Sequence, residues 1–416
     1  MMKFQIMLPT YNRGDLVGGA IKTVLAQENP NWSLLVVDNN SADNTAEVVK
    51  SFDDPRIRYV CNPTNTSMSG NWEFGLKHLE EADAYTVLGD DDGFLPNALT
   101  VVENMFQEHD IEAVRVDDGC FTYPAVDGST LSRLQASCRG EYSIYNSFEV
   151  LKKVARFEHP GGYKWLPSIY NSFFSRKLLE TIKEKSPERV FGSAAPDIYT
   201  AMLAGGLGVN FLYLSYPVKL PGTSPKSNGF LVGKTGKKGK IDPRASEFYK
   251  STIAEKLIRH DAITIFPHVW DSIQKVRSLL NIRDISLDSE RVYTAVVKEF
   301  LKRSNVLLEG DIQFLSEVCS VPVEDVRKDI SGRLKRKEVK ERKRKIRKAL
   351  TLSSLRRRIW PRSEPISSNK YFIDEYVADE SVNDIYSGCM YYYQMLQPLD
   401  FEVKPVEDVA GIYASE

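Results

Sequence analysis

Three consecutive aspartates, Asp90, Asp91 and Asp92, are the residues of this chain whose type and spacing point most directly to chemistry. They follow an apolar run at residues 85–88 that is typical of a buried strand, and a turn glycine, Gly93, comes next. Adjacent carboxylates repel one another, and a divalent cation with oxygen ligands removes that repulsion. A solvated acidic loop at the surface explains the same three residues, so the surrounding elements have to distinguish the two interpretations.

The region upstream alternates between strand-like and helix-like patterns. Apolar runs at residues 4–8, 33–37 and 57–60 are typical of short strands, and apolar residues recur at helical spacing over 16–27 and 46–52. This alternation predicts a parallel sheet with helices on both faces, and the continuous apolar character of the strands agrees with burial on both sides. Such a sheet places its ligand at the carboxyl ends of the strands, which is where the three aspartates stand.

Four segments of this region then occur in the order and at the spacings of a known family. They are Pro9–Arg13 after the first strand, Val36–Thr45 around the end of the second, Asn62–Trp72, and the aspartate triplet. Together they make residues 4 to about 105 resemble the donor-binding half of the family 2 glycosyltransferases. The resemblance implies an α/β fold of the GT-A type, a Rossmann-like nucleotide-diphospho-sugar transferase domain.

The resemblance also implies roles for the residues at the matching positions. Those that would bind the donor nucleotide are Pro9, Thr10, Tyr11, Arg13, Asp38, Asn71 and Asp90. Asp91, with help from Asp92, would hold Mn²⁺ or Mg²⁺ through the donor diphosphate. The family often spaces its acids as Asp-x-Asp, and here all three positions are Asp, so the motif leaves open which two matter. Counting back from Pro96 favours Asp91 as the principal ligand.

The expected reaction needs a base as well as a metal. Glycosyl transfer builds negative charge on the diphosphate and positive charge on the sugar, while the acceptor hydroxyl needs a general base. In family 2 enzymes this base is a carboxylate from the second half of the domain, and displacement inverts the anomeric centre. Asp197, which opens an apolar helix, is the candidate. Its position also suits an acidic residue favoured by the helix dipole, and Pro196 replaces the first acid of the family's usual pair.

Composition agrees with a water-soluble enzyme of one large domain and a smaller appendage. The chain has 416 residues, of which 42% are hydrophobic. Its five cysteines are scattered and odd in number, which indicates reduced thiols and a cytoplasmic location. Lys3 leads directly into the first strand, so we expect no signal peptide, and no apolar stretch reaches the ~18 residues of a spanning helix.

A strongly basic segment follows near the carboxyl end. Residues 333–358 hold fourteen Lys or Arg against two Glu, a balance of +12, while the whole chain is −1. A solvated charged helix explains this segment, and so does a helix lying on an anionic membrane, because apolar residues and Trp360 intersperse the charge. Nucleic acid is the third polyanion. We expect no nucleic-acid partner, because no recognisable module is present.

The expected organisation divides the chain into five parts. They are a GT-A domain at 1–225 (donor half 1–105, acceptor half 106–225), a Lys/Gly-rich loop at 226–244, helices at 245–330, a basic amphipathic helix at 331–362, and a tail at 363–416. The tail either packs on the domain or joins subunits into an oligomer.

The predicted function is a metal-dependent, inverting glycosyltransferase. It would move a sugar from a nucleotide sugar, with UDP expected, to a glycan or lipid-diphosphate-linked acceptor in surface polysaccharide synthesis. We expect it to lie at the inner face of the cell membrane as a peripheral protein. A nucleotidyltransferase and an inactive, membrane-docked sugar-nucleotide-binding scaffold are the alternatives. The first would show a glycine-rich basic loop where Pro9–Asn12 stand, and the second would show a broken acidic set.

Overall fold

The first half of the main sheet is built from four parallel strands. In the computed structural model, β1 (Phe4–Thr10) pairs with β2 (Trp32–Asp38) and β4 (Ala84–Val87), and β2 pairs with β3 (Ile57–Cys61). The strands and the parallel order predicted from the apolar runs are confirmed. The structure describes the chain except for residues 125, 127–128, 138–139, 158–161, 228–264, 304–308, 355–371, 398–402 and 407–416.

The second half of the sheet is mixed. β10 (Ser172–Ser175) runs antiparallel between β4 and β6 (Ala113–Asp118), and β11 (Asn210–Leu220) lies parallel to β6. The full order is β14-β9-β11-β6-β10-β4-β1-β2-β3, with β5 (Gly93–Phe94) beside β11. The last two strands in this half are β9 (Glu141–Asn146) and the edge strand β14 (Lys404–Pro405).

Helices cover both faces of the sheet, as predicted. Side chains of β2 alternate between the faces: Leu34 and Val36 belong to one apolar core, and Leu35 and Val37 to the other. The first core is covered by α1 (Val17–Leu25), α2 (Thr45–Lys50), α4 (Ala98–Glu108) and α14 (Ile385–Leu396). The second is covered by α3 (Met68–Leu76), α5 (Ser147–Ala155), α6 (Arg176–Lys185) and α7 (Pro196–Leu207). This period-two burial fixes the register of the strands.

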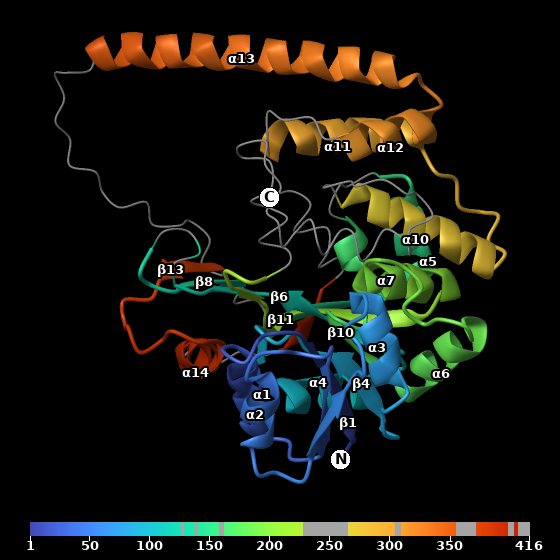
Figure 1. Cartoon of the computed structure of the whole chain (residues 1–416), viewed down its shortest axis with the longest axis vertical. Coiled ribbons are helices and arrows are strands. Elements are labelled where there is room, and N and C mark those ends of the chain that lie inside the picture. Colours follow the sequence, from blue (N-terminus) through green and yellow to red (C-terminus); the bar gives the residue numbers. More distant parts are fainter. Residues whose placement is uncertain are drawn as a thin grey trace.

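The carboxyl-terminal segment packs back on the domain. α14 lies against α1 (Figure 1). It also contacts β5, where Gly93 leaves no room for a side chain: a Cβ built at that position would lie only 2.6 Å from Sγ of Cys389. Tyr392 is fully buried in the same core. A second, four-stranded sheet contains β12 (Gly222–Thr223), β7 (Cys120–Thr122), β8 (Arg133–Ser137) and β13 (Phe372–Tyr376). Of the two roles left open for the tail, its described part packs on the domain.

The helical region extends from the face that α7 covers. α10 (Phe266–Leu279) packs on α7, and α11 (Ser289–Arg303) and α12 (Glu309–Cys319) follow. The long helix α13 (Val323–Ser354) forms one end of the molecule in Figure 1. Three expected segments lie outside the described residues. They are the first part of the helical region expected at 245–330, most of the loop expected at 226–244, and the part of the basic segment that includes Trp360. No helix in the described part of the chain has the length and apolarity to cross a membrane.

Candidate active site

The carboxyl ends of β1, β2 and β4 meet at one edge of the sheet. Thr10 lies opposite Asp38 in the register of β1 and β2, and Met7 lies opposite Val87 in that of β1 and β4. The polar turn after β1 and the aspartate triplet after β4 are therefore neighbours, although about eighty residues separate them in sequence. This is the edge at which an open α/β sheet binds its ligand.

Arg13 connects the turn after β1 to the aspartates. Its Nη1 donates to Oδ1 of Asp90 at 3.2 Å, and Thr10 Oγ1 donates to Oδ2 of Asp90 at 2.8 Å. Both carboxylate oxygens of Asp90 are thus engaged. Burial lowers the pKa of Arg13, but Asp90 and Asp91 outweigh burial and hold that pKa above its usual value. The guanidinium is therefore a fixed positive charge at this edge.

Asp91 is engaged on one side of its carboxylate. Its Oδ2 accepts from Ser224 Oγ at 3.0 Å and from Ser227 Oγ, and it lies 3.7 Å from Nη1 of Arg13. Its Oδ1 has no hydrogen-bond or ion-pair partner in the described part of the chain. Burial raises the pKa of Asp91 to about 7, with Asp90 and Asp92 adding to the rise and Arg13 opposing it.

Asp92 has a different set of partners. It is 1% exposed, and its Oδ2 lies 3.2 Å from Nζ of Lys219, which is itself buried in β11. Tyr170 OH and the backbone amide of Gly89 donate to the same oxygen, and the amide of Gly222 donates to Oδ1 at 2.9 Å. The predicted role of Asp92 beside a metal stays a prediction. In this structure its carboxylate links three segments of the domain.

Asp197 opens α7 on the other side of this network. Burial raises the pKa of its carboxyl, while backbone amides and the charges of Lys164 and Lys219 lower it. The negative charges of Asp92, Asp91 and Asp197 all help to raise the pKa of Tyr170, which is already raised by burial. These groups therefore share one electrostatic neighbourhood, with Tyr170 between the acidic triplet and the start of α7.

The remaining predicted donor residues flank this cluster. Asp38 is 1% exposed, and its carboxylate accepts from the amide of Ser41 at 2.8 Å and from Tyr59 OH at 2.6 Å. Asn71 donates from Nδ2 to the carbonyl of Val37 at 3.1 Å, and its buried Oδ1 has no hydrogen-bond partner in the described region. The structure places both side chains at the end of β2.

Two further predicted donor residues come from the end of β1. Pro9 lies within the strand and pairs with Val37 in the register. Tyr11 follows directly and is 45% exposed, which is unusual for a large aromatic ring at the end of a buried strand. An exposed ring beside buried polar groups is suited to stacking on a planar ligand.

The residues at this edge fit a divalent cation. Oδ1 of Asp91 is a carboxylate oxygen without a partner in the described chain, and burial, followed by the charges of Asp90 and Asp92, raises the pKa of the group. A nearby cation would favour the ionised form against both effects. Mg²⁺ binds through one or two carboxylates plus substrate phosphates. No group of three or more His, Cys, Asp or Glu is arranged to hold a metal within the described residues. A metal shared with a diphosphate does not require such a group.

Sequence reasoning missed several side chains of this site. Lys219, Tyr170, Ser224 and Ser227 contact the aspartates, yet none was singled out. A signal existed for one of them: Lys219 interrupts the apolar strand β11 (Asn210–Leu220), and a lone lysine there needs a buried acidic partner. The other three lie in turns or loops whose approach to the site depends on the fold.

Comparison with known proteins connects this edge to a family. Residues 5–151, which run from β1 into α5 and include the aspartate triplet, match the sequence model of glycosyl transferase family 2. These residues form a family 2 glycosyltransferase domain. The predicted resemblance is confirmed on this region, and Asp197 lies beyond the matched part of the family 2 domain.

Several bacterial proteins are similar over this family 2 domain. One is the GalNAc(5)-diNAcBac-PP-undecaprenol beta-1,3-glucosyltransferase of Campylobacter jejuni, 35% identical over 204 residues, covering 47% of this chain and 58% of that protein. Another is the UDP-Glc:alpha-D-GlcNAc-diphosphoundecaprenol beta-1,3-glucosyltransferase WfgD of Escherichia coli, 32% identical over 106 residues, covering 26% of this chain and 42% of that protein. The chain thus spans roughly half the length of these relatives.

A solved structure shows a distant likeness over more of the chain. The structure of S. aureus TarS 1-349 in complex with UDP covers 82% of this chain and 92% of that one, at 14% identity and a TM-score of 0.45. The assignment of an α/β architecture rests on this chain's own sheet order and on the helices that cover both faces of the sheet.

Proposed function

We propose that this protein is a metal-dependent, inverting glycosyltransferase that takes a sugar from a nucleotide sugar, with UDP as the expected nucleotide. The observation that carries the proposal is the arrangement of Arg13, Asp90 and Asp91. A charged guanidinium and a carboxylate with one oxygen left over lie together at the carboxyl edge of a family 2 domain. That combination suits a diphosphate and its counter-cation.

The donor is held, in this proposal, by side chains from three strand ends. Tyr11 stacks on the base and the oxygens of Asp38 and Asn71 face the nucleoside, while Arg13 pairs with the diphosphate. Asp91, whose Oδ1 is without a partner in the described chain, would hold Mn²⁺ or Mg²⁺, with help from Asp92. When bound, such a metal supplies Lewis-acid stabilisation of charge on the leaving diphosphate.

The chain's own residues carry the rest of the chemistry. The acceptor oxygen forms a bond to the anomeric carbon as the bond from that carbon to the diphosphate oxygen breaks. Asp197 takes the hydroxyl proton, and the bonding electron pair leaves with the diphosphate. Attack from the face opposite the leaving group inverts the anomeric centre. Burial raises the pKa of Asp197 above its usual value, which makes its carboxylate a stronger base.

The proposed acceptor is a glycan on a lipid-diphosphate carrier. The names of two relatives include diphosphoundecaprenol or PP-undecaprenol acceptors, which are anchored in a bilayer. The basic segment of residues 333–360 would attach the protein to an anionic membrane surface, where such an acceptor is presented. Each exposed Lys or Arg near an anionic leaflet contributes about 1 kcal/mol.

Turnover with defined substrates tests this proposal. Purified protein would be incubated with UDP-glucose, UDP-galactose, UDP-N-acetylglucosamine or UDP-N-acetylgalactosamine, Mn²⁺, and synthetic lipid-diphosphate sugars, and products identified by mass spectrometry. Transfer of one sugar, with NMR showing an anomeric configuration opposite to that of the donor, is the expected result. Retained configuration would exclude a single displacement by the acceptor hydroxyl with Asp197 as its base. Release of inorganic diphosphate when UTP and a sugar 1-phosphate replace these substrates would instead identify a nucleotidyltransferase, and donor binding without any transfer would identify an inactive scaffold.

A further inference from the structure

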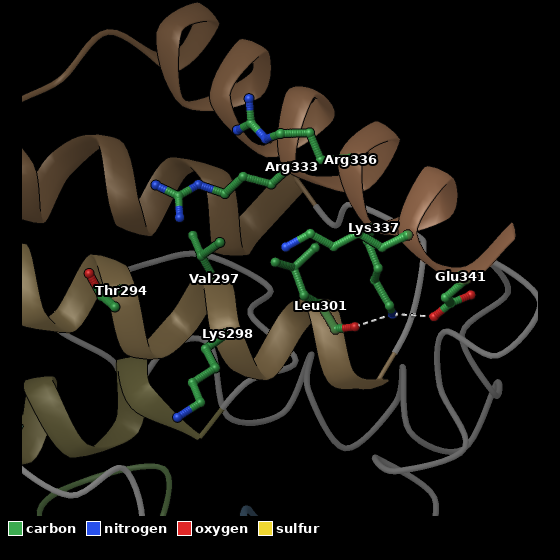
Figure 2. Close-up of a pocket in the computed structure, with 9 residues that line it drawn as sticks. Thr294, Val297, Lys298, Leu301, Arg333, Arg336, Lys337 and Glu341 are labelled. Carbon is green, nitrogen blue, oxygen red and sulfur yellow. Dashed lines mark hydrogen bonds and ion pairs between the residues drawn. The ribbon is translucent and has the colours of Figure 1, made fainter. Parts of the chain in front are cut away.

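A cavity away from the acidic edge lies between two helices of the carboxyl-terminal region. It has a volume of about 630 Å³ and is lined by one face of α11 and one face of α13. Figure 2 shows the side chains of the two helices on either side of it. Val297 and Leu301 of α11 form an apolar wall. The basic residues of α13 that line the opposite side are Arg333, Arg336, Lys337 and Lys340.

Two of the basic residues have structural partners. Arg333 Nε donates to Oδ2 of Asp329 at 2.8 Å, and Lys337 donates to the carbonyl of Leu301 and lies 3.9 Å from Glu341. The bond from Lys337 reaches the last turn of α11, where a cation is favoured by the helix dipole. The bond to Leu301 attaches α13 to α11, the other two contacts lie within α13, and together they leave little of either charge for a ligand.

Three other basic residues around the cavity have no such partners. Lys298 from α11 and Arg336 and Lys340 from α13 are exposed, and no ion pair or hydrogen bond engages their cationic groups in the described chain. Their long side chains can reorient over the cavity while the aliphatic stems cover its wall. The charge of Arg336 also acts on Asp329, but the lining holds five cations against the one carboxylate of Glu341. The cavity therefore combines an excess of positive charge with an apolar wall.

The course of α13 adds a second argument for an anionic occupant. Val326 and Ile330 are buried against the neighbouring helices, but Val339 is 51% exposed. Past Leu334 the helix leaves the core and carries exposed cations on several sides, including Lys335, Lys340 and Lys343. Core packing does not explain a helix that is polar on all sides, because such a helix has no apolar face to bury. The cavity stands where this projecting part begins.

We propose that the cavity between α11 and α13 binds the phosphate head group of an anionic membrane lipid. Arg336 and Lys340 would hold the phosphate, because a guanidinium presents several donors to phosphate oxygens and an ammonium adds a point charge. Val297 and Leu301 would contact the first carbons of the lipid chain. A cavity of this size exceeds a lone phosphate and suits a head group. The inference rests on the membrane attachment proposed above, and it names a discrete site within that attachment.

Binding of a soluble short-chain lipid tests this site. The full-length protein would be titrated, by calorimetry, with dihexanoylphosphatidylglycerol below its micelle concentration, with dihexanoylphosphatidylcholine, and with inorganic phosphate. The test variant is Arg336→Gln/Lys340→Gln. The matched control is Lys335→Gln/Lys343→Gln, which removes the same charge from α13 at residues that do not line the cavity. Circular dichroism would check that each variant keeps its helices.

The expected result is saturable, one-to-one binding of the phosphatidylglycerol. The test variant should bind about tenfold or more weakly, and the control within about twofold of wild type. Equal losses in both variants, equal binding of phosphatidylcholine, or no saturable binding would each overturn the lipid site. Phosphate binding as tight as that of the lipid would overturn the lipid as occupant. Calorimetry with UDP and Mn²⁺ on the same samples separates this result from failure of the proposed enzyme function, which depends on the acidic edge.

Discussion

At the scale of single residues, three neighbouring aspartates have three different environments. Asp90 is held by Thr10 and Arg13, Asp91 keeps one oxygen without a partner in the described chain, and Asp92 is paired with a buried lysine. The sequence predicts the acidic triplet and its place at the end of a strand. It cannot predict which carboxylate is available, because Lys219 and the serines come from segments more than a hundred residues away.

The buried ion pair between Lys219 and Asp92 should be essential for stability. In Lys219→Met, Asp92 stays buried without its cation, and we expect a loss of about 3–5 kcal/mol in the free energy of unfolding. Lys226→Met is the control, because Lys226 pairs with Asp15 at the surface and should cost no more than about 1 kcal/mol. Urea unfolding of both variants measures the difference. Losses of equal size would show that Asp92 does not depend on Lys219.

Asp197 should set the acid side of the pH profile. Because burial raises its pKa, the carboxylate is protonated, and inactive as a base, at a pH where an ordinary aspartate is still ionised. Activity should therefore fall as pH decreases through this raised pKa, and Asp197→Asn should lower kcat by about 10²- to 10⁴-fold at all pH values. Measurement of kcat against pH tests both expectations.

Lys164 provides a finer test of the same assignment. Its positive charge lowers the pKa of Asp197, so Lys164→Met should move the acid limb of the profile to higher pH. Lys164 is exposed, and the shift should stay below about one pH unit. The control is Lys185→Met, which removes an exposed charge from the end of α6. An acid limb that moves in neither variant, or equally in both, would argue for a different base.

At the scale of elements, local patterns predicted the first half of the sheet better than the second. Each of β1, β2 and β3 is followed by a helix or a short turn, so apolar periodicity along the chain reveals both the strands and their parallel order. In the second half, β10 enters between β4 and β6, and β11 pairs with three strands, β5, β6 and β9, from distant parts of the chain. Such pairings are decided by tertiary packing and leave little local signal.

The packing of α14 on the domain gives a prediction at this scale. Tyr392 is completely buried between α14 and the core beneath α1, so Tyr392→Ala leaves a large cavity. We expect a loss of about 3–5 kcal/mol in unfolding free energy. The control Tyr376→Ala removes a ring that is 49% exposed and should cost much less. Thermal unfolding followed by circular dichroism distinguishes the two, and similar melting temperatures for the variants would contradict the docked position of α14.

At the scale of the whole molecule, charge is divided unevenly between α13 and the rest of the chain. The acidic triplet lies at the edge of the sheet, and the basic residues concentrate on α13, which forms one end of the molecule in Figure 1. Residues 333–358 carry a net charge of +12 and the whole chain carries −1, so the rest of the chain has a net charge of −13. A molecule polarised in this way should orient on an anionic surface with α13 toward it.

Vesicle binding tests this orientation. Six basic residues would be changed to Gln: Arg336, Lys340, Arg342, Lys343, Lys345 and Arg347. At about 1 kcal/mol each, their loss should release the protein from phosphatidylglycerol vesicles at physiological salt. The control changes six exposed lysines elsewhere, namely Lys22, Lys50, Lys77, Lys153, Lys183 and Lys185. Sedimentation with vesicles should separate the first variant from both wild type and control. Persistent binding of the first variant would place the membrane contact elsewhere.

The central claim is that Asp91 binds a metal that holds a nucleoside diphosphate, and one calorimetric experiment tests it most directly. Wild type, Asp91→Asn and the exposed control Asp15→Asn would be titrated with UDP, GDP, CMP and dTDP, with and without Mn²⁺. We predict Mn²⁺-dependent binding of UDP to wild type and control, and at least about a hundredfold weaker binding to Asp91→Asn. Unchanged Mn²⁺-dependent affinity in Asp91→Asn, or no binding of any nucleotide by wild type, would contradict the claim.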